Sequence, residues 1–172
     1  MATKTQARTA GEVAQSAFDA FKERDLDKLA ANWREDGVEE IVPVGILRGP
    51  REICDNVREM FAAAPDIEPV LERIVADGDH AVLQWRASGT FDGEPIQGIQ
   101  PTGSHIELRF VEMMEVEDGL IVRNTAYYDG SAFARQIGMM PEQESGAEKA
   151  MIAAFNAVTK LRKAIARRKA TA

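Results

Sequence analysis

The sequence lacks three features that are typical of secreted or membrane proteins: paired cysteines, a membrane-spanning segment and a signal peptide. A single cysteine, Cys54, rules out an internal disulfide framework. No stretch approaches the roughly 20 apolar residues that a membrane-spanning helix needs. Residues 1–9 lack the apolar core of a signal peptide. These absences predict a cytoplasmic protein with no membrane span.

The sequence is equally poor in signals for metal or cofactor binding. Its two histidines, His80 and His105, have no partners at the spacing of a metal site or a catalytic triad. No glycine-rich phosphate-binding loop is present, and Cys54 falls on the predicted buried face of a helix, where a thiol is inert. We therefore expect no metal and no cofactor.

The composition is that of one soluble globular domain, with 45% apolar and 28% charged residues, enough for a core and a ligand cavity. Charge is unevenly distributed. Residues 1–143 hold 14 Lys and Arg against 26 Asp and Glu, whereas residues 144–172 hold 7 against 2. The acidic body argues against nucleic acid as a partner. The basic C-terminal segment is either simply solvated or a contact surface.

The apolar periodicity predicts helices first and strands afterwards. A capping box at Thr9-Ala10-Gly11-Glu12 opens the first helix, a short second helix reaches Trp33, and Gly49-Pro50 opens a third. Pro43 marks the strand-like segment 38–44 as an edge or a bulge. Further strands are predicted over 67–76, 81–91, 106–117 and 120–129, a closing helix near 132–139, and a last helix over 147–168. This order predicts an α+β fold with the helices on one sheet face.

The segment 118–129 holds the most informative residues. Asp118-Gly119 predicts a hairpin turn, because a tight turn between twisted strands needs positive φ. The following strand ends at Asp129, just before Gly130. A carboxyl group at that position is either a general acid/base or the N-cap of the next helix.

The order and spacing of several short motifs resemble the SnoaL-like polyketide cyclases. These belong to the nuclear-transport-factor-2-like superfamily, which also holds ketosteroid isomerases and limonene epoxide hydrolases. The matching residues are Arg24-Asp25-Leu26-Asp27, Gly49-Pro50, Trp85 with Gly89-Thr90 and Gly93, Asp118-Gly119-Leu120-Ile121, Tyr128-Asp129, Arg135-Gln136-Ile137-Gly138 and Pro141. The resemblance covers about residues 10–141 and implies a cone-shaped, strongly curved antiparallel sheet that wraps around helices and encloses an apolar pocket, commonly in a homodimer.

The resemblance implies that Asp129 is the catalytic acid/base. Strand alternation places Tyr127 on the same face, so its hydroxyl is expected on the pocket side, although both tyrosines can also be packing residues. Arg86 would stabilise an enolate or clamp a carboxylate, or else be an exposed edge residue. Ser88 stands where epoxide hydrolases carry a second carboxylate, which argues against epoxide hydrolysis. No histidine can be assigned to assist Asp129, as one usually does in the cyclases.

Further residues are candidates for binding the ligand. Glu112 interrupts an otherwise apolar strand face, so it is either a second pocket acid paired with Arg86 or the sign of a bulge, which we prefer. Asn32, Trp33 and Met60 can line the pocket mouth or belong to the core. The predicted ligand-binding set is Trp33, Met60, Gln84, Ser88, Glu112 and Thr125.

The sequence thus predicts a SnoaL-like domain over residues 10–141 and a helical extension with a basic end over residues 142–172. The expected activity is that of a cofactor-independent cyclase or isomerase acting on a small apolar carbonyl compound, such as a polyketide, steroid or terpenoid. The alternative is a non-catalytic module of the same fold that binds a small apolar ligand or mediates dimerisation. A homodimer is expected in either case.

Overall fold

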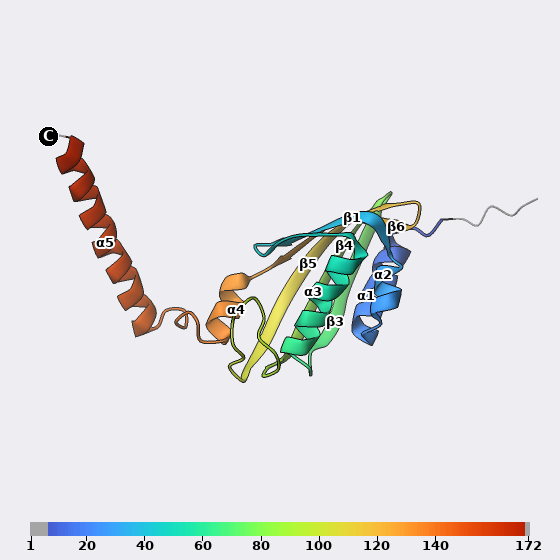
Figure 1. The fold of residues 1–172 in the computed structure, drawn as a ribbon, viewed down its shortest axis with the longest axis horizontal. Coiled ribbons are helices and arrows are strands. Elements are labelled where there is room, and N and C mark those ends of the chain that lie inside the picture. The colour runs from blue at the N-terminus through green and yellow to red at the C-terminus, as the bar shows by residue number, and fades with distance from the viewer. Residues whose placement is uncertain (1–6, 171–172) are drawn as a thin grey trace, which may run out of the picture.

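The structure, a computed structural model, describes residues 7–170. A strongly curved six-stranded sheet packs against helices on one face, and the last helix extends away from this body (Figure 1). The α+β class, the curved sheet and the additional C-terminal helix are as predicted. Thr171 and Ala172, the end of the predicted extension, lie outside the described residues.

Three helices form the N-terminal layer: α1 Ala10–Glu23, α2 Leu26–Ala30 and α3 Gly49–Ala63. The predicted capping box is present, since the Thr9 hydroxyl accepts a bond from the Glu12 backbone N–H and the Glu12 carboxylate accepts one from the Thr9 N–H. The prediction that the second helix reaches Trp33 is wrong. Trp33 begins a strand, because its backbone pairs with Ile121 of the neighbouring strand instead of continuing the helix.

The strands run in the order β2-β1-β6-β5-β4-β3. Their bounds are β1 Trp33–Val42, β2 Gly45–Arg48, β3 Glu68–Asp77, β4 His80–Phe91, β5 Ser104–Glu117 and β6 Leu120–Tyr128. All neighbours are antiparallel except β1 and β6, which are parallel. The expectation that Pro43 lies in an edge strand or at a bulge is wrong, because β1 ends before it and the irregularity in β1 lies between Trp33 and Val38. Strand β1 is paired on both sides and ends at Val42, while β2, which the sequence did not predict, occupies the edge.

The turn between β5 and β6 is the one predicted from Asp118-Gly119. Both residues have positive φ, 51° and 77°. This geometry matches the right-handed twist of the flanking strands, and glycine adopts it without a Cβ clash. The turn sets the register of β6 against β5, in which Glu112 lies opposite Ala126. That register determines which side chains of β6 face the helices.

The main core lies between the helices and the concave face of the sheet. Helix α1 contributes Val13, Ala17 and Phe18, and α3 contributes Ile53 and Val57, all buried. These side chains meet the alternate, inward-facing residues of β4, such as Leu83 and Trp85. Apolar burial of this kind is the main favourable contribution to folding. The packing is incomplete near the sheet centre, where a cavity remains.

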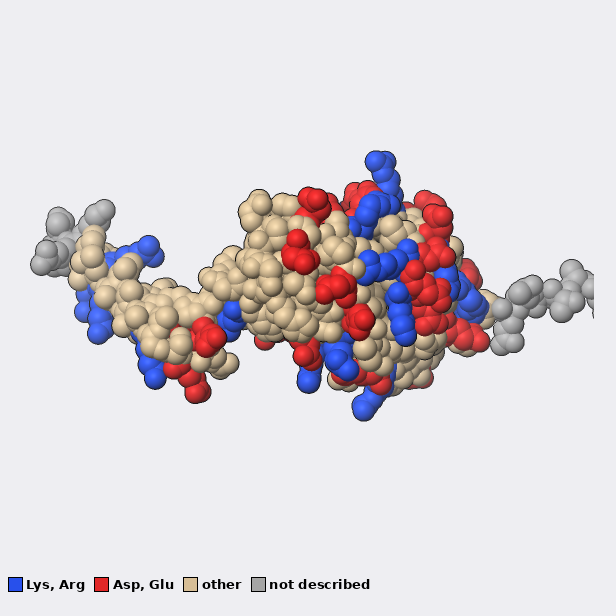
Figure 2. All heavy atoms as spheres, turned by 90° about the horizontal axis from the view of Figure 1, so that it is seen from below, with Lys and Arg blue, Asp and Glu red and all other residues tan. Residues whose placement is uncertain are grey.

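The C-terminal segment differs from this body. Helix α4, Gly130–Gln136, closes one end of the body, and α5, Gly146–Ala170, projects from it. An ion pair of 2.7 Å between Arg135 and Glu148 joins the two helices. The large apolar side chains of α5 form an exposed stripe, with Phe155 at 69%; its members are Met151, Ile152, Phe155, Val158, Leu161 and Ile165. Figure 2 shows acidic and basic side chains interspersed over the body and mainly basic ones along α5. Among the described residues, no helix is long and apolar enough to cross a membrane.

Candidate active site

A cavity of about 180 Å³ lies between α1, α3 and the concave face of the sheet. Its walls are almost entirely apolar. They include Phe18 and Phe21 from α1, Ile53, Val57 and Met60 from α3, and Trp33, Leu83, Phe91, Phe110 and Met114 from the strands. Cavities of about 150 Å³ with such walls bind benzene. The space therefore suits an apolar ligand of about one ring, or one ring of a larger ligand.

Two carboxylic acids project into this apolar space. Glu39 comes from β1 and Glu112 from β5, and both line the cavity together with Asn124 from β6. Glu39 lies directly opposite Asn124 in the β1–β6 pairing, and Glu112 lies diagonally from it across β5 and β6. Side chains in these positions on one sheet face are within reach of each other. The three strands therefore bring three polar groups to one point.

The amide of Asn124 joins the two acids. Its Nδ2 group donates to Glu39 Oε1 at 3.0 Å and to Glu112 Oε2 at 2.8 Å. The second oxygen of Glu112, Oε1, accepts a bond of 2.8 Å from the indole N–H of Trp85. Glu112 thus receives two N–H donors and Glu39 one. We call Glu39, Glu112 and Asn124 the acid cluster.

Burial raises the pKa of both acids. Glu39 is only 9% exposed, and loss of solvation together with the nearby charge of Glu112 raises its pKa to about 8, against a smaller opposing effect of the Asn124 bond. Loss of solvation also raises the pKa of Glu112, and the bonds from Asn124 and Trp85 partly oppose this. The two sites interact and titrate as a pair. These raised pKa values keep a proton on the pair at neutral pH. With one proton shared between the two groups, the protonated acid can donate a proton and the ionised one can accept a proton.

Tyr128 and the aromatic residues complete the surroundings of the acid cluster. Trp85 stacks on Phe110, with ring centroids 4.0 Å apart and an interplanar angle of 9°. Phe110 in turn lies 5.7 Å from Tyr128, measured between ring centroids. Burial raises the pKa of the Tyr128 hydroxyl, so this group stays neutral in the physiological range. An apolar wall thus surrounds the acid cluster and keeps water from stabilising its charges.

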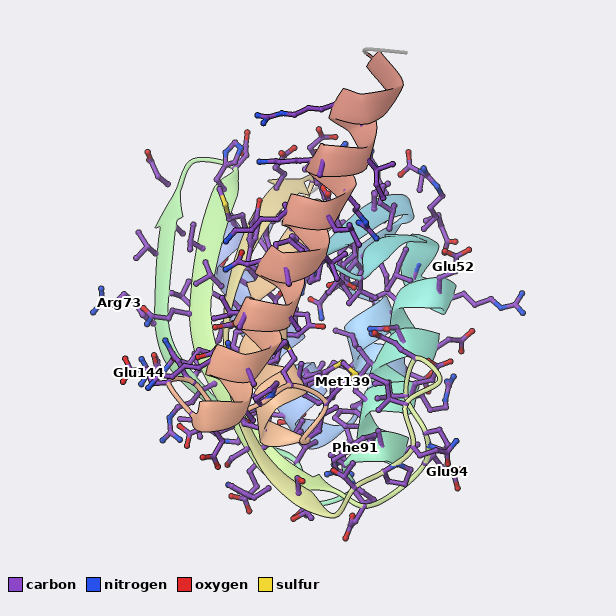
Figure 3. All side chains as sticks on the ribbon, turned by 90° about the vertical axis from the view of Figure 1, so that its left-hand side faces the viewer. Glu52, Arg73, Phe91, Glu94, Met139 and Glu144 are labelled. Atoms are coloured by element: carbon purple, nitrogen blue, oxygen red, sulfur yellow. The ribbon has the colours of Figure 1, made fainter. Side chains whose placement is uncertain are left out.

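A second hollow adjoins the cavity at α4 and three loops, and we call it the mouth. This shallow hollow is bounded by Pro43, Asp129 and Met139 and shares Tyr128 and Phe133 with the cavity. Figure 3 looks onto this end of the body and labels Phe91, at the end of β4, and the exposed Met139. A ligand approaching from this side would pass Asp129 before reaching the acid cluster.

Asp129 itself is the N-cap of α4. Its Oδ1 accepts bonds of 2.9 Å from the backbone N–H groups of Ser131 and Ala132, and its side chain is exposed at the mouth. The structure thus contains the capping arrangement that the sequence left as an alternative. The carboxyl groups that lie inside the apolar cavity are those of Glu39 and Glu112.

The expectation that Tyr127 faces the pocket is wrong. Tyr127 is 46% exposed and lies on the outer face of the sheet, whereas Tyr128, Ala126 and Asn124 face the cavity. The alternation along β6 was correctly predicted, but the inward face was assigned to the wrong set of residues. Because side chains alternate with a period of two, an offset of one residue places the predicted site residues of β6 on the outer face.

The same offset places four other predicted residues away from the cavity. Arg86 forms a 3.6 Å ion pair with Glu72 on the outer face, and Gln84 donates to the same carboxylate at 3.0 Å. Ser88 and Thr125 also alternate with cavity residues and lie outside. Arg73 on β3 marks this outer side in Figure 3, where it points away from the helices. Arg86 is therefore not paired with Glu112.

Trp33, Met60 and Glu112 do line the cavity. Asn32 does not line it, but is buried and accepts a hydrogen bond from Arg8. The preference for a bulge at Glu112 is wrong. Strand β4 pairs with β5 without interruption at this position, and the β5–β6 irregularity lies between Glu115 and Val116. Glu112 thus keeps the inward direction of Phe110 and Met114. A charged residue on an apolar strand face was the signal that pointed to the true site.

Glu39 and Asn124 were missed. Glu39 lies in the sequence Val38-Glu39-Glu40-Ile41, where two adjacent acids give no indication of which one is buried. Asn124 alternates with Tyr127 along β6, and the site was expected on the face of Tyr127. Its position between apolar and small residues, Ile121 and Ala126, was the available signal, since a buried amide requires a partner.

Comparisons with known proteins identify the family and the fold. The family model for the SnoaL-like polyketide cyclases matches residues 12–137. The chain belongs to this family. Among solved structures, a proposed SnoaL-like polyketide cyclase from Jannaschia sp. CCS1 aligns with a TM-score of 0.69 and 19% identity, over 81% of this chain and 100% of that one.

Two further solved structures show the same fold. IdmH from Streptomyces antibioticus, a proposed polyketide cyclase, has a TM-score of 0.65 and 24% identity over 76% of this chain and 99% of its own. A proposed ketosteroid isomerase from Kribbella flavida has a TM-score of 0.56 and 21% identity, over 73% of this chain and 82% of its own. No curated protein matches the sequence. Membership of the family supports the fold of a cyclase or isomerase. Sequence identities this low do not indicate which substrate is used.

Proposed function

We propose that the protein is a cofactor-independent cyclase or isomerase that acts on a small apolar carbonyl compound through Glu39 and Glu112. The observation that carries the proposal is the pair of enclosed carboxyl groups, bridged by Asn124, in an otherwise apolar cavity. Acids in such an environment have pKa values closer to neutrality, which is what proton exchange with a carbon acid requires. The role first assigned to Asp129 passes to the acid cluster.

The hydrogen bonds assign a role to each acid. Glu112 receives N–H donors on both oxygens, which stabilises its anion, while Glu39 receives one and retains the shared proton. In the proposed reaction, Glu39 donates a hydrogen bond to the substrate carbonyl oxygen. Glu112 accepts the proton from the adjacent carbon, and the electrons of the C–H bond form an enol or enolate. Preorganised donors in a dry site stabilise such charge most effectively.

The enol then has two outcomes, and both return the proton. In a ring closure, its carbon attacks a second carbonyl group of the same molecule, and Glu112 gives its proton to the resulting alkoxide. In an isomerisation, Glu112 returns the proton to a different carbon and the double bond shifts. Neither route needs an external oxidant, reductant or metal.

The first step can be tested without knowledge of the substrate. The protein in D₂O would be mixed with a panel of ring-sized ketones, and loss of the proton signals beside the carbonyl would be followed by NMR. We expect accelerated exchange, and Glu112→Gln should slow it by about 10²- to 10⁴-fold, the usual contribution of a general base. Glu115→Gln, on the outer face of the same strand, is the matched control and should exchange at the wild-type rate. Equal rates for the two variants would refute the assignment of Glu112.

A second candidate function is a non-catalytic ligand-binding module. The exposure and capping role of Asp129 favour it, because the carboxyl group that the family resemblance marks as catalytic is engaged elsewhere. This reading predicts that ketones bind in the cavity without any exchange of their protons. Measurable exchange that depends on Glu112 would exclude it.

We further propose that the chain forms a homodimer in which α5 takes part. The support is the exposed apolar stripe of α5, which leaves this helix without a core of its own. Sedimentation velocity would compare the full chain with a version ending at residue 143. A dimer that dissociates on truncation supports the proposal, and identical sedimentation of the two would contradict it.

A further inference from the structure

The acid cluster contains more hydrogen-bond acceptors than donors. Its two carboxyl groups and one amide present five oxygens when both acids are ionised, while Asn124 and Trp85 supply three N–H groups. All three N–H groups are already used, two by Asn124 and one by Trp85. Among the described residues, no donor reaches Asn124 Oδ1, although this side chain is only 1% exposed. A buried acceptor without a donor is unusual, and it shows that the cluster has too few hydrogen-bond donors.

The cavity also contains no positive charge to balance the acids. None of the described residues that line it is Lys, Arg or His. The titratable groups that face the cluster are Glu39 on β1, Glu112 on β5 and Tyr128 on β6, and the Cys54 thiol on α3 lies close enough to be affected by Glu39. Each of these groups is neutral or negative. Buried carboxylates in proteins are normally paired with a cation.

The walls suit a cation as well as an apolar ligand. Trp85 lies against Phe110, Phe18 and Phe21, with centroid separations of 4.0, 6.0 and 5.3 Å. The faces of such rings attract cations, and Trp attracts them most strongly. The cavity is large enough for about one ring. A ligand carrying an ammonium group on a ring-sized body would match the acids, the walls and the volume.

We propose that the cavity binds a protonated primary amine carried on an apolar, ring-sized body, with the ammonium group at the Glu39–Glu112 pair. The ammonium group supplies three N–H donors to a site that lacks donors, and one positive charge to a pair of acids that lacks a counter-ion. The inference goes beyond the proposed reaction. It also implies that the substrate is a carbonyl compound that carries a basic nitrogen, and this implication rests on the proposed reaction.

Two consequences follow from the chemistry. An anionic ligand of the same size is excluded, because its charge would lie beside the acids with no donor free to receive it. Binding of the amine also displaces the proton that the pair shares at neutral pH, and this proton passes to the buffer. Raising the pH towards the pKa of Glu39, about 8, removes this proton from the free protein, so the affinity for the amine increases. The increase ends at the pH at which the amine itself loses its charge.

Three probes of equal size isolate the charge of the ligand: benzylamine, benzyl alcohol and benzoate. Binding can be followed by fluorescence, because the two tryptophans of the chain, Trp33 and Trp85, both line the cavity. We expect benzylamine to bind at least tenfold more tightly than benzyl alcohol, and benzoate more weakly than either. Equal or tighter binding of the alcohol, or preferential binding of benzoate, would overturn the inference.

Calorimetry in two buffers of different ionisation enthalpy measures the displaced proton. At pH 7, benzylamine should release a substantial fraction of one proton to the buffer and benzyl alcohol none. Between pH 6 and 8, the affinity for benzylamine should rise while that for benzyl alcohol stays constant. Amine binding with no proton release and no pH dependence would show that the acid pair does not hold the ammonium group.

Variants then locate the effect. Glu39→Gln and Glu112→Gln should reduce the affinity for benzylamine at least tenfold and leave benzyl alcohol binding within twofold. Glu40→Gln and Glu115→Gln, which remove the same charge from the outer face, should change neither. Retained alcohol binding shows that a variant is folded, and if a Gln variant does not fold, the pH dependence of wild-type binding decides the question. Equal loss of amine affinity in all four variants would point to a general effect of net charge and contradict the inference.

These results separate the inference from the proposed reaction. Ketone exchange without a preference for the amine would refute the amine site and leave the reaction standing. A preference for the amine that depends on both acids, without exchange of any ketone, would refute the reaction and leave a binding site for amines.

Discussion

The two faces of the sheet carry similar residues and have opposite properties. Glu39 and Glu40 are neighbours on β1, yet Glu39 is 9% exposed and lies in the cavity while Glu40 lies on the outer face. Tyr128 and Tyr127 differ in the same way on β6. Only burial distinguishes the members of each pair. The comparison shows that the environment, more than the residue type, makes a carboxyl group in this fold suitable for proton transfer.

The largest expected difference between the faces is in the pH dependence of stability. The pKa of Glu39 is raised to about 8 in the folded state, so the folded protein holds a proton that the unfolded chain loses above its ordinary value near 4.5. The contribution of Glu39 to stability is therefore fully present below that value and is lost as the pH rises towards 8, by about 4 kcal/mol. Glu39→Gln should flatten this decrease, and Glu40→Gln should leave its slope unchanged. Denaturant unfolding between pH 5 and 8 measures both, and a wild-type stability that does not fall would contradict the burial argument.

A smaller effect is expected for neighbouring residues on β4. Trp85→Phe keeps a ring in the stack but removes the N–H that bonds to Glu112 Oε1. Losing a donor to a buried charged group costs about 1–3 kcal/mol. Arg86→Gln removes only an exposed ion pair with Glu72, which is worth about 0–1 kcal/mol. Urea unfolding at pH 7 compares the two, and an equal loss would mean that the Trp85 bond contributes nothing beyond packing.

At the mouth of the cavity, Asp129 should behave as a helix cap. Asp129→Ala removes the acceptor of two backbone N–H groups and should lower stability by about 1 kcal/mol. Asp129→Asn keeps an acceptor oxygen and should cost less. Ketone exchange should persist in both variants. If Asp129→Asn abolishes exchange while Glu112→Gln does not, the catalytic carboxyl group is at the mouth and not in the cavity.

The smallest effects should come from the tyrosine hydroxyls. Tyr127→Phe changes a half-exposed residue on the outer face and should alter stability by less than about 0.5 kcal/mol, with no change in probe binding. Tyr128→Phe removes a hydroxyl that lines the cavity and should shift the affinity for benzyl alcohol by a few-fold. The same fluorescence titration serves for both. A greater response at Tyr127 would reverse the assignment of the two faces.

Much of the fold could be predicted because it depends on local signals. The capping box at Thr9 and the positive-φ turn at Asp118-Gly119 both act over a few residues, and both are present. The boundary at Trp33 and the short strand β2 could not be predicted in this way. Trp33 continues the apolar spacing of the preceding helix, but its backbone pairs with β6 and it belongs to β1. Strand β2 forms because it pairs with β1, and its own sequence shows no strand pattern.

The candidate site was less predictable than the fold. Trp33, Met60 and Glu112, three of the residues expected to bind a ligand, line the cavity, and Glu112 stands out in the sequence as a charged residue on an otherwise apolar strand face. Asp129, Tyr127 and Arg86 were chosen for their chemistry, and the structure places them at the mouth or outside. A strand pattern has two faces of equal period, so the sequence alone does not specify which one meets the helices.

The amino-acid sequence by itself determined the elements, the hairpin and the membership of an α+β family, since caps, turns and apolar periods operate between near neighbours. Tertiary structure alone decided that Glu39, Glu112 and Asn124, which lie on three different strands, meet at one point in the cavity. The physical reason is that solvation of a carboxyl group depends on what packs around it. That packing comes from parts of the chain up to 85 residues apart.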